Sequence, residues 1–253
     1  MKRKLFLAAT MLLVTLGMSA QSVTIELTPE QYQKIKDQAV REHEQWRTNN
    51  NDWGGLHVYA ARNTEVTKAP KGILYGNSIT EGWWRADEDF FHEYGLLGRG
   101  ISGQVTSQML CRFRQDVIDL HPGFVAILAG VNDIALNNGP ISIEGTMNNI
   151  ISMCELAKAN GIRPVLCLLT PAARAGWRPQ VTDMPDQIDK LNALIAAYGK
   201  KAHITVVDYY TPLVTDTRSM NPDCTRDGLH PTLDGYKIME ATLVKALKLK
   251  KQK

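Results

Sequence analysis

Ser78, Asp227 and His230 are residue types that can together carry out nucleophilic catalysis. A serine hydroxyl is a weak nucleophile until a base removes its proton, and that base needs a third group to orient it. In the stretch "DGLH", Asp227 precedes His230 by three residues. Its carboxylate can therefore fold back onto the imidazole Nδ1 and direct Nε2 toward Ser78. The alternative interpretation is structural: His230-Pro231 starts the last helix and Asp227 caps a turn.

Three further groups could stabilise negative charge on an acyl intermediate. The backbone N–H groups of Ser78 and Gly100 and the side-chain amide of Asn132 are donors of the kind that forms an oxyanion hole. Glycine at a strand end, as at position 100, permits close approach of the backbone. The alternatives are an ordinary turn glycine for Gly100 and a local Asx-turn for Asn132.

These residues must be positioned by the elements from Lys71 onward, where apolar runs alternate with longer helical patterns. The strand candidates are "GILYG", "LLGRG", "FVAILAG", "RPVLCLL" and "ITVVD". Near-continuous apolar strands between helices predict a parallel sheet that is covered on both faces. Ligands of such sheets bind beyond the carboxyl ends of the strands. Ser78, Gly100 and Asn132 each follow a strand, and "DGLH" follows the fifth, so the sequence predicts that they meet at one edge.

Four stretches, taken together and in order, resemble the signature blocks of the SGNH, or GDSL-type, esterase family. They are "GNSIT", "GRGISG", "GVND" and "DGLHP", and the resemblance covers residues 71–250. It implies a flavodoxin-like α/β/α sandwich with a parallel five-stranded sheet and no cofactor. It also implies Ser78 as nucleophile, His230 as general base and then acid, and Asp227 as its orienter. The oxyanion hole would consist of Ser78 N–H, Gly100 N–H and the Asn132 amide.

Two details refine this resemblance. Asn77 departs from the commonest family pattern, which has Asp before the nucleophile, and "VAILAGVND" looks like the branch similar to platelet-activating-factor acetylhydrolase. The motifs also exclude neighbouring classes. An α/β-hydrolase would need the motif GxSxG, but Thr80 stands in place of the second glycine. A zinc metalloprotease would need HExxH, but Arg47 stands in place of the second histidine, and the motif GxxxxGK[ST] of nucleotide hydrolases does not occur.

The N-terminus predicts export. Lys2, Arg3 and Lys4 precede an apolar run over residues 5–16 and a small-residue end. This is the pattern of a secretory signal peptide, here residues 1–20, and the run is short for a membrane span. No cysteine lies near residue 20, which argues against a lipid anchor. We expect a secreted or periplasmic protein.

The rest of the chain is predicted to divide into two parts. Residues 21–70 form an N-terminal extension, with a helix that starts at Thr28-Pro29-Glu30 and a loop over residues 47–63. Residues 71–253 form the hydrolase domain. The extension is expected to pack on this domain or to act as a lid or a partner-binding arm.

The net charge and the cysteine spacing bear on whether the protein binds nucleic acid or a metal ion. Removing residues 1–20 takes away three positive charges, so the formal net charge of +3 falls to zero. A neutral chain has no general electrostatic reason to bind nucleic acid. The four cysteines show no CxxC spacing, and the remaining histidines show no ligand spacing, so we expect structural thiols and no metal. The sequence leaves the oligomeric state open.

The substrate pocket should be built from loops that follow the strands. The candidate lining residues are Trp83, Trp84, Arg85, Arg174, Trp177 and Arg178. Alternatively, the tryptophans pack against the N-terminal extension. Aromatic faces suit sugar rings or acyl chains, and no extended apolar lid is evident. We therefore expect the protein to hydrolyse short acyl esters, with acetylated carbohydrates as the substrates. The open alternatives are a lysophospholipase or thioesterase, an acyltransferase, and a non-catalytic glycan-binding module.

Overall fold

The computed structural model describes residues 28–252, apart from the side chains of residues 43–50. The chain divides into two compact units, Met1–Trp53 and Gly54–Lys253, so the extension expected over residues 21–70 is shared between them. The signal peptide expected over residues 1–20 lies outside the described residues. Among the helices of the described part, none is long and apolar enough to cross a membrane.

The first unit contains the helix α1 (Pro29–Asn51), which begins where the sequence predicted. Thr28 Oγ1 accepts a hydrogen bond from Gln31 N–H at 3.1 Å, and Gln31 Oε1 accepts one from Thr28 N–H at 2.9 Å. This reciprocal pair is a capping box, and Pro29 occupies the first helical position, where its missing N–H costs nothing.

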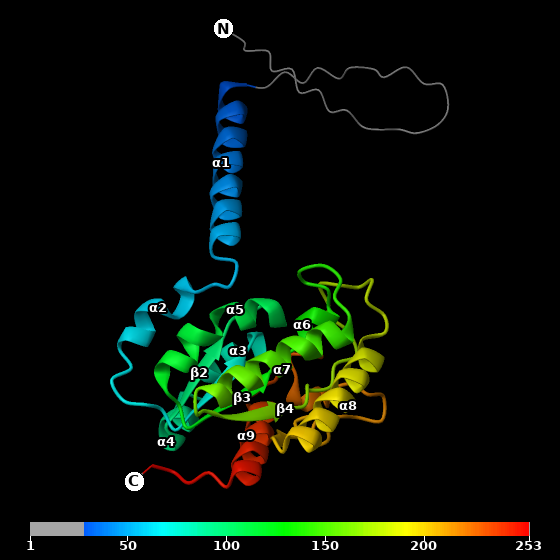
Figure 1. The fold of residues 1–253 in the computed structure, drawn as a ribbon. Helices are drawn as coiled ribbons and strands as arrows, with labels where there is room; N and C mark the ends of the chain where they lie inside the picture. Colours follow the sequence, from blue (N-terminus) through cyan, green and yellow to red (C-terminus); the bar gives the residue numbers. More distant parts are fainter. Residues whose placement is uncertain (1–27, 253) are drawn as a thin grey trace. The chain divides into compact units, whose positions relative to one another are not determined.

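The loop predicted over residues 47–63 is confirmed only for residues 52–56, and the prediction is wrong for the rest. Helix α1 continues through Asn51, and a second helix, α2 (His57–Thr64), forms at the start of the second unit (Figure 1). The Asn- and Gly-rich composition suggested a loop, but burial of Tyr59 on α2 outweighs such weak local preferences.

The second unit is built on five parallel strands, as predicted. They are β1 (Gly72–Gly76), β2 (Leu96–Gly100), β3 (Phe124–Leu128), β4 (Arg163–Cys167) and β5 (Thr205–Val207). Their order in the sheet is β2-β1-β3-β4-β5, with every neighbouring pair parallel. This is the flavodoxin-like order, in which the carboxyl ends of β1 and β3 flank the switch point where ligands bind.

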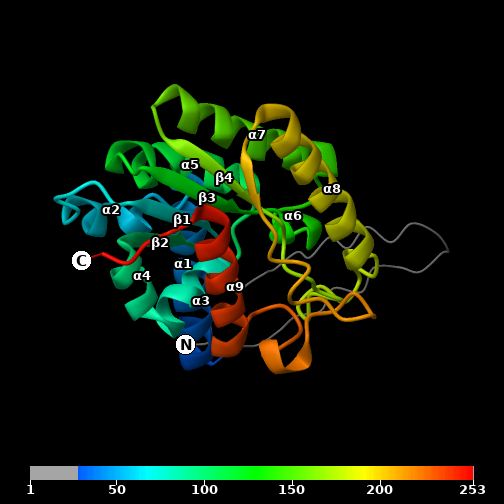
Figure 2. The ribbon, with the colours of Figure 1, turned by 90° about the horizontal axis from the view of Figure 1, so that it is seen from below.

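Helices cover both faces of this sheet and complete the predicted three-layer sandwich (Figure 2). One face carries α3 (Ser78–Ala86), α4 (Glu88–Tyr94) and α9 (Leu233–Leu247). The other carries α5 (Thr106–Asp116), α7 (Ile143–Ala159) and α8 (Met184–Ala202). Short helices lie in the connections: η1 (Ile118–Leu120), α6 (Val131–Ile134) and η2 (Pro222–Cys224).

The strands are buried on both sides, which is why they read as continuous apolar runs. All five residues of β1 and of β3 are buried. Cys154 of α7 and Cys167 of β4 also lie in this core, and burial raises the pKa of each thiol to about 12. These two cysteines, like Cys111 and Cys224, are free thiols.

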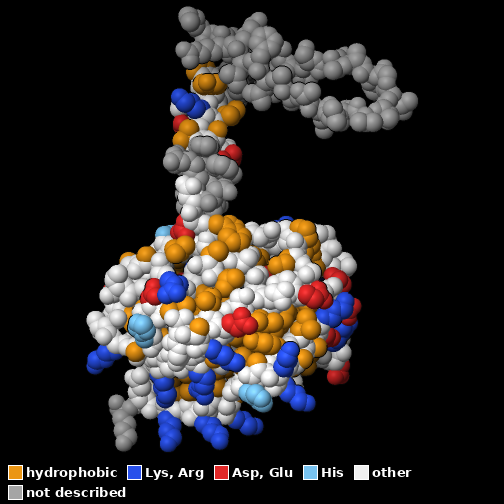
Figure 3. All heavy atoms as spheres, in the orientation of Figure 1, with side chains coloured by type: hydrophobic (Ala, Val, Ile, Leu, Met, Phe, Trp, Pro, Cys, Tyr) orange, Lys and Arg blue, Asp and Glu red, His pale blue; other side chains and the backbone are white. Residues whose placement is uncertain are grey.

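Basic side chains gather at the end of the sheet where the strands begin. Lys71, Arg163, Lys200 and Lys248 are exposed there, and Lys71 Nζ donates to the carbonyl of Lys250. Figure 3 shows the lysines and arginines along the lower edge of this unit. The carboxyl ends of the strands lie at the opposite end, so the predicted site is separated from this basic edge.

Candidate active site

Ser78 is the first residue of α3, immediately after β1. The turn between them, at Asn77, is tight, since a Cβ on Gly76 would lie 2.9 Å from the Cβ of Thr80 in the first turn of α3. The first N–H groups of a helix have no partner within the helix. The turn therefore presents the hydroxyl of Ser78 and its own N–H together at the carboxyl edge of the sheet.

The structure brings Ser78, His230 and Asp227 together. His230 Nε2 lies 3.0 Å from Ser78 Oγ, across 152 residues of sequence. His230 Nδ1 lies 2.7 Å from Asp227 Oδ2. The other carboxylate oxygen of Asp227 accepts the backbone N–H groups of Leu229 at 3.0 Å and His230 at 2.8 Å. Gly228, at φ 89°, supplies the left-handed backbone conformation that this turn needs.

The electrostatics of the turn keep Asp227 ionised. Burial alone would raise the pKa of this carboxyl. The hydrogen bonds that it accepts from the His230 N–H, the His230 ring and the Leu229 N–H outweigh that effect and hold its pKa below the usual range. A carboxylate held in this form can fix the orientation of the imidazole and stabilise its protonated state. The His230 side chain is 30% exposed, so a substrate can reach it.

Gly100 ends β2 beside Gly76, at the same edge of the sheet. A Cβ at position 100 would lie 2.6 Å from the carbonyl oxygen of Asn77 and even closer to the N–H of Glu81. Only glycine therefore allows β2 to lie this close to the first turn of α3. The close approach answers the question that the sequence left open, because Gly100 is more than an ordinary turn glycine.

Asn132 lies on α6, buried to 1% exposure. Its Nδ2 donates to the carbonyl oxygen of Gln104 at 2.9 Å, across 28 residues of sequence. This long-range bond differs from the local Asx-turn that was the structural alternative. Because a primary amide carries two N–H bonds, the side chain has a second donor beyond the one that Gln104 accepts.

Asn77 is buried to 1% exposure, and its side-chain oxygen and nitrogen have no hydrogen-bond partner among the described residues. It borders a small cavity that Leu128, Leu169 and Thr170 also line. An unpaired neutral amide costs far less to bury than an unpaired carboxylate. Asn at this position therefore suits the surroundings better than the Asp of the commonest family pattern.

The first aromatic pair was wrongly expected to line a pocket. Trp83 is 2% exposed, stacks on Tyr236 at 5.5 Å between ring centroids, and donates from Nε1 to Glu240 at 3.1 Å. Trp84 packs on Phe91 of α4. The ring contacts of both tryptophans among the described residues are with α4, α9 and Tyr209. The exposed Arg85 pairs with Glu81 on the same helix.

Trp177, in the loop after β4, does reach the site. Its ring centroid lies 6.2 Å from that of His230 at a 30° tilt, and the residue is 45% exposed. Trp177 Nε1 donates to Asn137 Oδ1 at 2.8 Å, which fixes the ring. Arg178 Nη2 donates to the carbonyl of the same Asn137 at 3.4 Å. Arg174 is exposed, and no contact places it at the site.

Sequence reasoning missed a buried carboxylate beside the site. Asp133 follows Asn132, and its Oδ1 accepts from Thr106 Oγ1 at 2.5 Å, while the Thr106 N–H lies 3.0 Å from Oδ2. These bonds join α6 to the start of α5. The hydrogen bonds from Thr106 lower the pKa of Asp133, but desolvation by burial has the larger effect and raises this pKa to about 6. The sequence held a signal, since Asp133 stands in the "GVND" block directly after the expected oxyanion donor Asn132.

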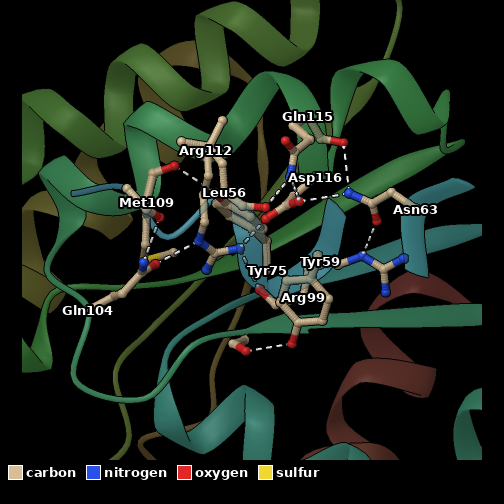
Figure 4. Close-up of polar contacts among 12 residues, drawn as sticks. Leu56, Tyr59, Asn63, Tyr75, Arg99, Gln104, Met109, Arg112, Gln115 and Asp116 are labelled. Atoms are coloured by element: carbon tan, nitrogen blue, oxygen red, sulfur yellow. Dashed lines mark hydrogen bonds and ion pairs between the residues drawn. The ribbon is translucent and has the colours of Figure 1, made fainter. Parts of the chain in front are cut away.

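A second missed feature is a polar network beneath the strand ends, centred on Arg112 of α5 (Figure 4). Arg112 and Asp116 are both fully buried and form an ion pair of 2.9 Å. Together with Met109 and Phe113 they follow helical spacing on the buried face of α5. Charged residues at such core positions are the signal that could have revealed the network. Within the described residues, no group of three or more His, Cys, Asp or Glu side chains could hold a metal ion.

Comparison with known proteins gives a match to a family model, the GDSL-like lipase/acylhydrolase family, over residues 74–238. Two solved structures are similar over most of the chain. A GDSL-like lipase from Bacteroides thetaiotaomicron is 46% identical, with a TM-score of 0.74, over 77% of this chain and 98% of that one. A protein from Bacteroides fragilis assigned as an acylhydrolase is 45% identical, with a TM-score of 0.76, over 78% and 97%.

More distant matches add little beyond the fold. A lipoprotein of Bacillus subtilis, uncharacterised, is 34% identical over 79 residues, which is 30% of this chain and 32% of that protein. The chain thus matches about a third of the length of this curated relative. The structure of a catalytic mutant of an acetylxylan esterase from Geobacillus stearothermophilus is 15% identical, with a TM-score of 0.59, over 71% of this chain and 94% of that one.

Proposed function

The chain belongs to the GDSL-like lipase/acylhydrolase family and is a carboxylic ester hydrolase, and we propose that it removes short acyl groups, acetyl foremost, from carbohydrate. The observation that carries the proposal is the aligned set of contacts at Ser78, His230 and Asp227. Nε2 lies 3.0 Å from the serine oxygen while Nδ1 lies 2.7 Å from the carboxylate. This is the arrangement of a nucleophile, a base and the group that orients the base.

In the first half of the reaction, Ser78 Oγ attacks the carbonyl carbon of the ester while His230 Nε2 takes the hydroxyl proton. The carbonyl oxygen becomes an oxyanion, which the N–H groups of Ser78 and Gly100 and the amide of Asn132 stabilise. His230 then returns its proton to the alkoxide of the leaving alcohol as the C–O bond breaks. The products of this step are the free alcohol and an acyl group on Ser78.

The second half regenerates the enzyme. His230 takes a proton from water, whose oxygen attacks the acyl carbon and forms a second oxyanion in the same hole. The bond to Ser78 Oγ breaks as His230 gives the proton back to the serine. The carboxylic acid leaves, and no external reductant, oxidant or metal enters this scheme.

Trp177 supports a carbohydrate as the carrier of the acyl group. A partly exposed indole beside His230 offers an apolar face to whatever carries the ester. Sugar rings have apolar faces of matching size. A protein that shares the fold, from Geobacillus stearothermophilus, is an acetylxylan esterase. Its substrate class is consistent with a carbohydrate as the carrier of the acyl group.

Export is part of the proposal. The charged start, the apolar run and the small residues up to position 20 support cleavage of a signal peptide and action outside the cytoplasm. N-terminal sequencing of the protein recovered from cell fractions tests this point. A mature chain that starts at residue 21 in an extracytoplasmic fraction is expected, and an intact N-terminus in the cytoplasm would contradict it.

The central test is an assay of the purified protein on p-nitrophenyl acetate, butyrate and octanoate, with a Ser78→Ala variant shown to be folded by circular dichroism. We expect hydrolysis that declines with chain length and that falls by roughly 10⁴-fold or more in Ser78→Ala. Release of acetate from acetylated xylo-oligosaccharides, measured with the same pair of proteins, extends the test to the proposed substrate class.

The competing functions give different outcomes. A preference for octanoate or for lysophospholipids would indicate a lysophospholipase. Transfer of the acyl group to an added sugar would indicate an acyltransferase. Equal inactivity of both proteins, with no labelling of Ser78 by a fluorophosphonate, would overturn the triad assignment and favour a glycan-binding module.

A further inference from the structure

The strand ends that carry the proposed oxyanion hole are held from below by one buried guanidinium. Arg112 Nη2 donates to the carbonyl of Gly76 at 2.9 Å, and Nη1 donates to the carbonyl of Arg99 at 3.2 Å. Arg112 Nε donates to Gln104 Oε1 at 2.6 Å. Asp116 balances the charge at 2.9 Å. A rigid fork of donors thus fixes the ends of β1 and β2 with respect to each other (Figure 4).

The bond to Arg99 bears directly on the oxyanion hole. The carbonyl of Arg99 and the N–H of Gly100 belong to the same peptide unit, so a donor on that carbonyl sets the direction of the N–H and polarises it. Gln104, whose side chain Arg112 also holds, accepts the Asn132 amide through its carbonyl. Two of the three proposed donors are therefore oriented through this network.

The next peptide unit, from Gly100 to Ile101, is held by a residue that precedes the sheet in the sequence. The hydroxyl of Tyr59 on α2 donates to the carbonyl of Gly100 at 2.5 Å. Tyr59 is 5% exposed, and the guanidinium of Arg99 lies 4.8 Å from the centre of its ring. Desolvation raises the pKa of Tyr59, so its hydroxyl stays protonated and remains a donor.

Other contacts fix α2 itself. Asn63 Nδ2 donates to Asp116 Oδ1 at 2.8 Å, and Asn63 Oδ1 accepts from Arg99 Nε at 2.9 Å. The carbonyl of Leu56 accepts from Gln115 at 2.7 Å. Because these bonds join both ends of α2 to α5 and β2, the Tyr59 hydroxyl is held in a defined position.

We propose that Tyr59 is a positioning residue of the active site: its hydroxyl holds the peptide that follows Gly100, while Arg112 holds the peptide that precedes it, and the two together keep the N–H of Gly100 directed toward the oxyanion. This inference rests on the proposed function, which assigns the N–H of Gly100 to the oxyanion hole. It gives α2, outside the stretch that matches the family model, a part in the reaction. Tyr59 touches neither the substrate nor the reacting atoms.

The test compares Tyr59→Phe with Tyr75→Phe in the full-length protein. Tyr75 is a matched control, since its hydroxyl is also buried and donates to a backbone carbonyl, that of Met109, at 2.6 Å, but holds none of the peptides of the proposed oxyanion hole. Met109 lies on α5, away from the peptides that flank Gly100. Both variants lose one buried hydroxyl that donates to a backbone carbonyl, so we expect losses of stability of the same order in denaturant melts.

The kinetic readouts separate positioning from stability. For Tyr59→Phe we expect kcat on p-nitrophenyl acetate to fall about tenfold with KM nearly unchanged, less than the loss on removing an oxyanion donor outright. We also expect Ki for a trifluoromethyl ketone, whose adduct with Ser78 carries an oxyanion, to rise by a similar factor. Tyr75→Phe should leave both quantities within about twofold of the wild type.

The possible outcomes are distinct. Wild-type kcat and Ki in Tyr59→Phe, or equal losses in both variants, would overturn the inference and leave the proposed function standing. Hydrolysis by the wild-type protein that survives Ser78→Ala would instead overturn the proposed function and this inference with it.

Discussion

Trp177 is the residue whose position bears most directly on the choice of substrate. Its indole is 45% exposed and tilted by 30° to the ring of His230, and the hydrogen bond to Asn137 fixes its plane. A flat apolar surface that is held rigidly loses little conformational entropy when a ligand stacks on it. The ring therefore suits recognition of the alcohol part of the ester.

Replacing Trp177 by Ala is expected to raise KM for acetylated xylo-oligosaccharides by about tenfold, since stacking on one aromatic face contributes up to about 1.4 kcal/mol. Constants for p-nitrophenyl acetate, which carries no sugar, should change less than about threefold. Initial rates on both substrates give this comparison, and Trp177→Phe, which keeps an aromatic face, should recover part of the loss. Equal effects on both substrates would assign Trp177 to support of His230 instead.

At the same scale, the site residues illustrate what sequence can predict. Ser78, Gly100 and Asn132 were placed correctly at strand ends because the topology of a parallel sheet brings all such ends to one edge. Trp83 was misplaced because it follows the nucleophile in the sequence, whereas its side chain lies on the inner side of α3. Proximity along the chain does not specify on which side of a helix a residue lies.

Among the elements, α5 and α6 meet through one buried carboxylate. Asp133 of α6 accepts from the first residue of α5, Thr106. Burial nevertheless raises the pKa of Asp133 to about 6, above its ordinary 3.8. The folded state therefore binds a proton at this position more tightly than the unfolded state does.

This pKa predicts how stability depends on pH. Because folding raises the pKa of this carboxyl, its protonation contributes to the free energy of unfolding at pH 4, and this contribution is lost as the pH rises through about 6. A shift of two pKa units corresponds to roughly 3 kcal/mol. Urea unfolding at pH 4 and pH 7 should show that Asp133→Asn removes a decline of this order in the free energy of unfolding. The exposed Asp119 of η1 provides a control, since Asp119→Asn should leave the decline intact. Parallel profiles for the wild type and Asp133→Asn would contradict the prediction.

The elements differ in how well sequence alone predicts them. Strand β1 matches its predicted run from end to end because burial on both faces demands an apolar sequence, and β2 also matches its run although Arg99 interrupts it. Helix α2 was not predicted from the sequence because its helical preference is weak. Its stability comes from contacts with β2 and α5, some 40 to 60 residues away in the sequence. Local patterns carry no information about such contacts.

For the whole molecule, the division of the chain at Gly54 predicts the effect of truncation. Residues 54–253 retain α2 and should keep kcat on p-nitrophenyl acetate within about twofold of the full-length protein. Residues 71–253 lack Tyr59 and Asn63, which leaves Asp116 and the carbonyl of Gly100 without these partners. Each polar group that loses its hydrogen-bond partner costs about 1–3 kcal/mol of the free energy of unfolding. We therefore expect residues 71–253 to be less stable and to have a more than tenfold lower kcat.

Circular dichroism, denaturant melts and kinetics on the two truncated proteins measure these effects. Similar activity in both would show that α2 is dispensable. Loss of activity in residues 54–253 would assign a catalytic or assembly role to the first unit, which the oligomeric state by light scattering would distinguish.

The distance along the chain between Ser78 and His230 has a consequence for biosynthesis. The proposed nucleophile is synthesised 152 residues before its proposed base, so a ribosome-bound chain carries an unactivated serine until residue 230 has been made. Any product that ends before Asp227 would be catalytically silent. Ester hydrolysis therefore reports that synthesis has passed His230, and a nascent chain shorter than this carries no activity from the proposed triad.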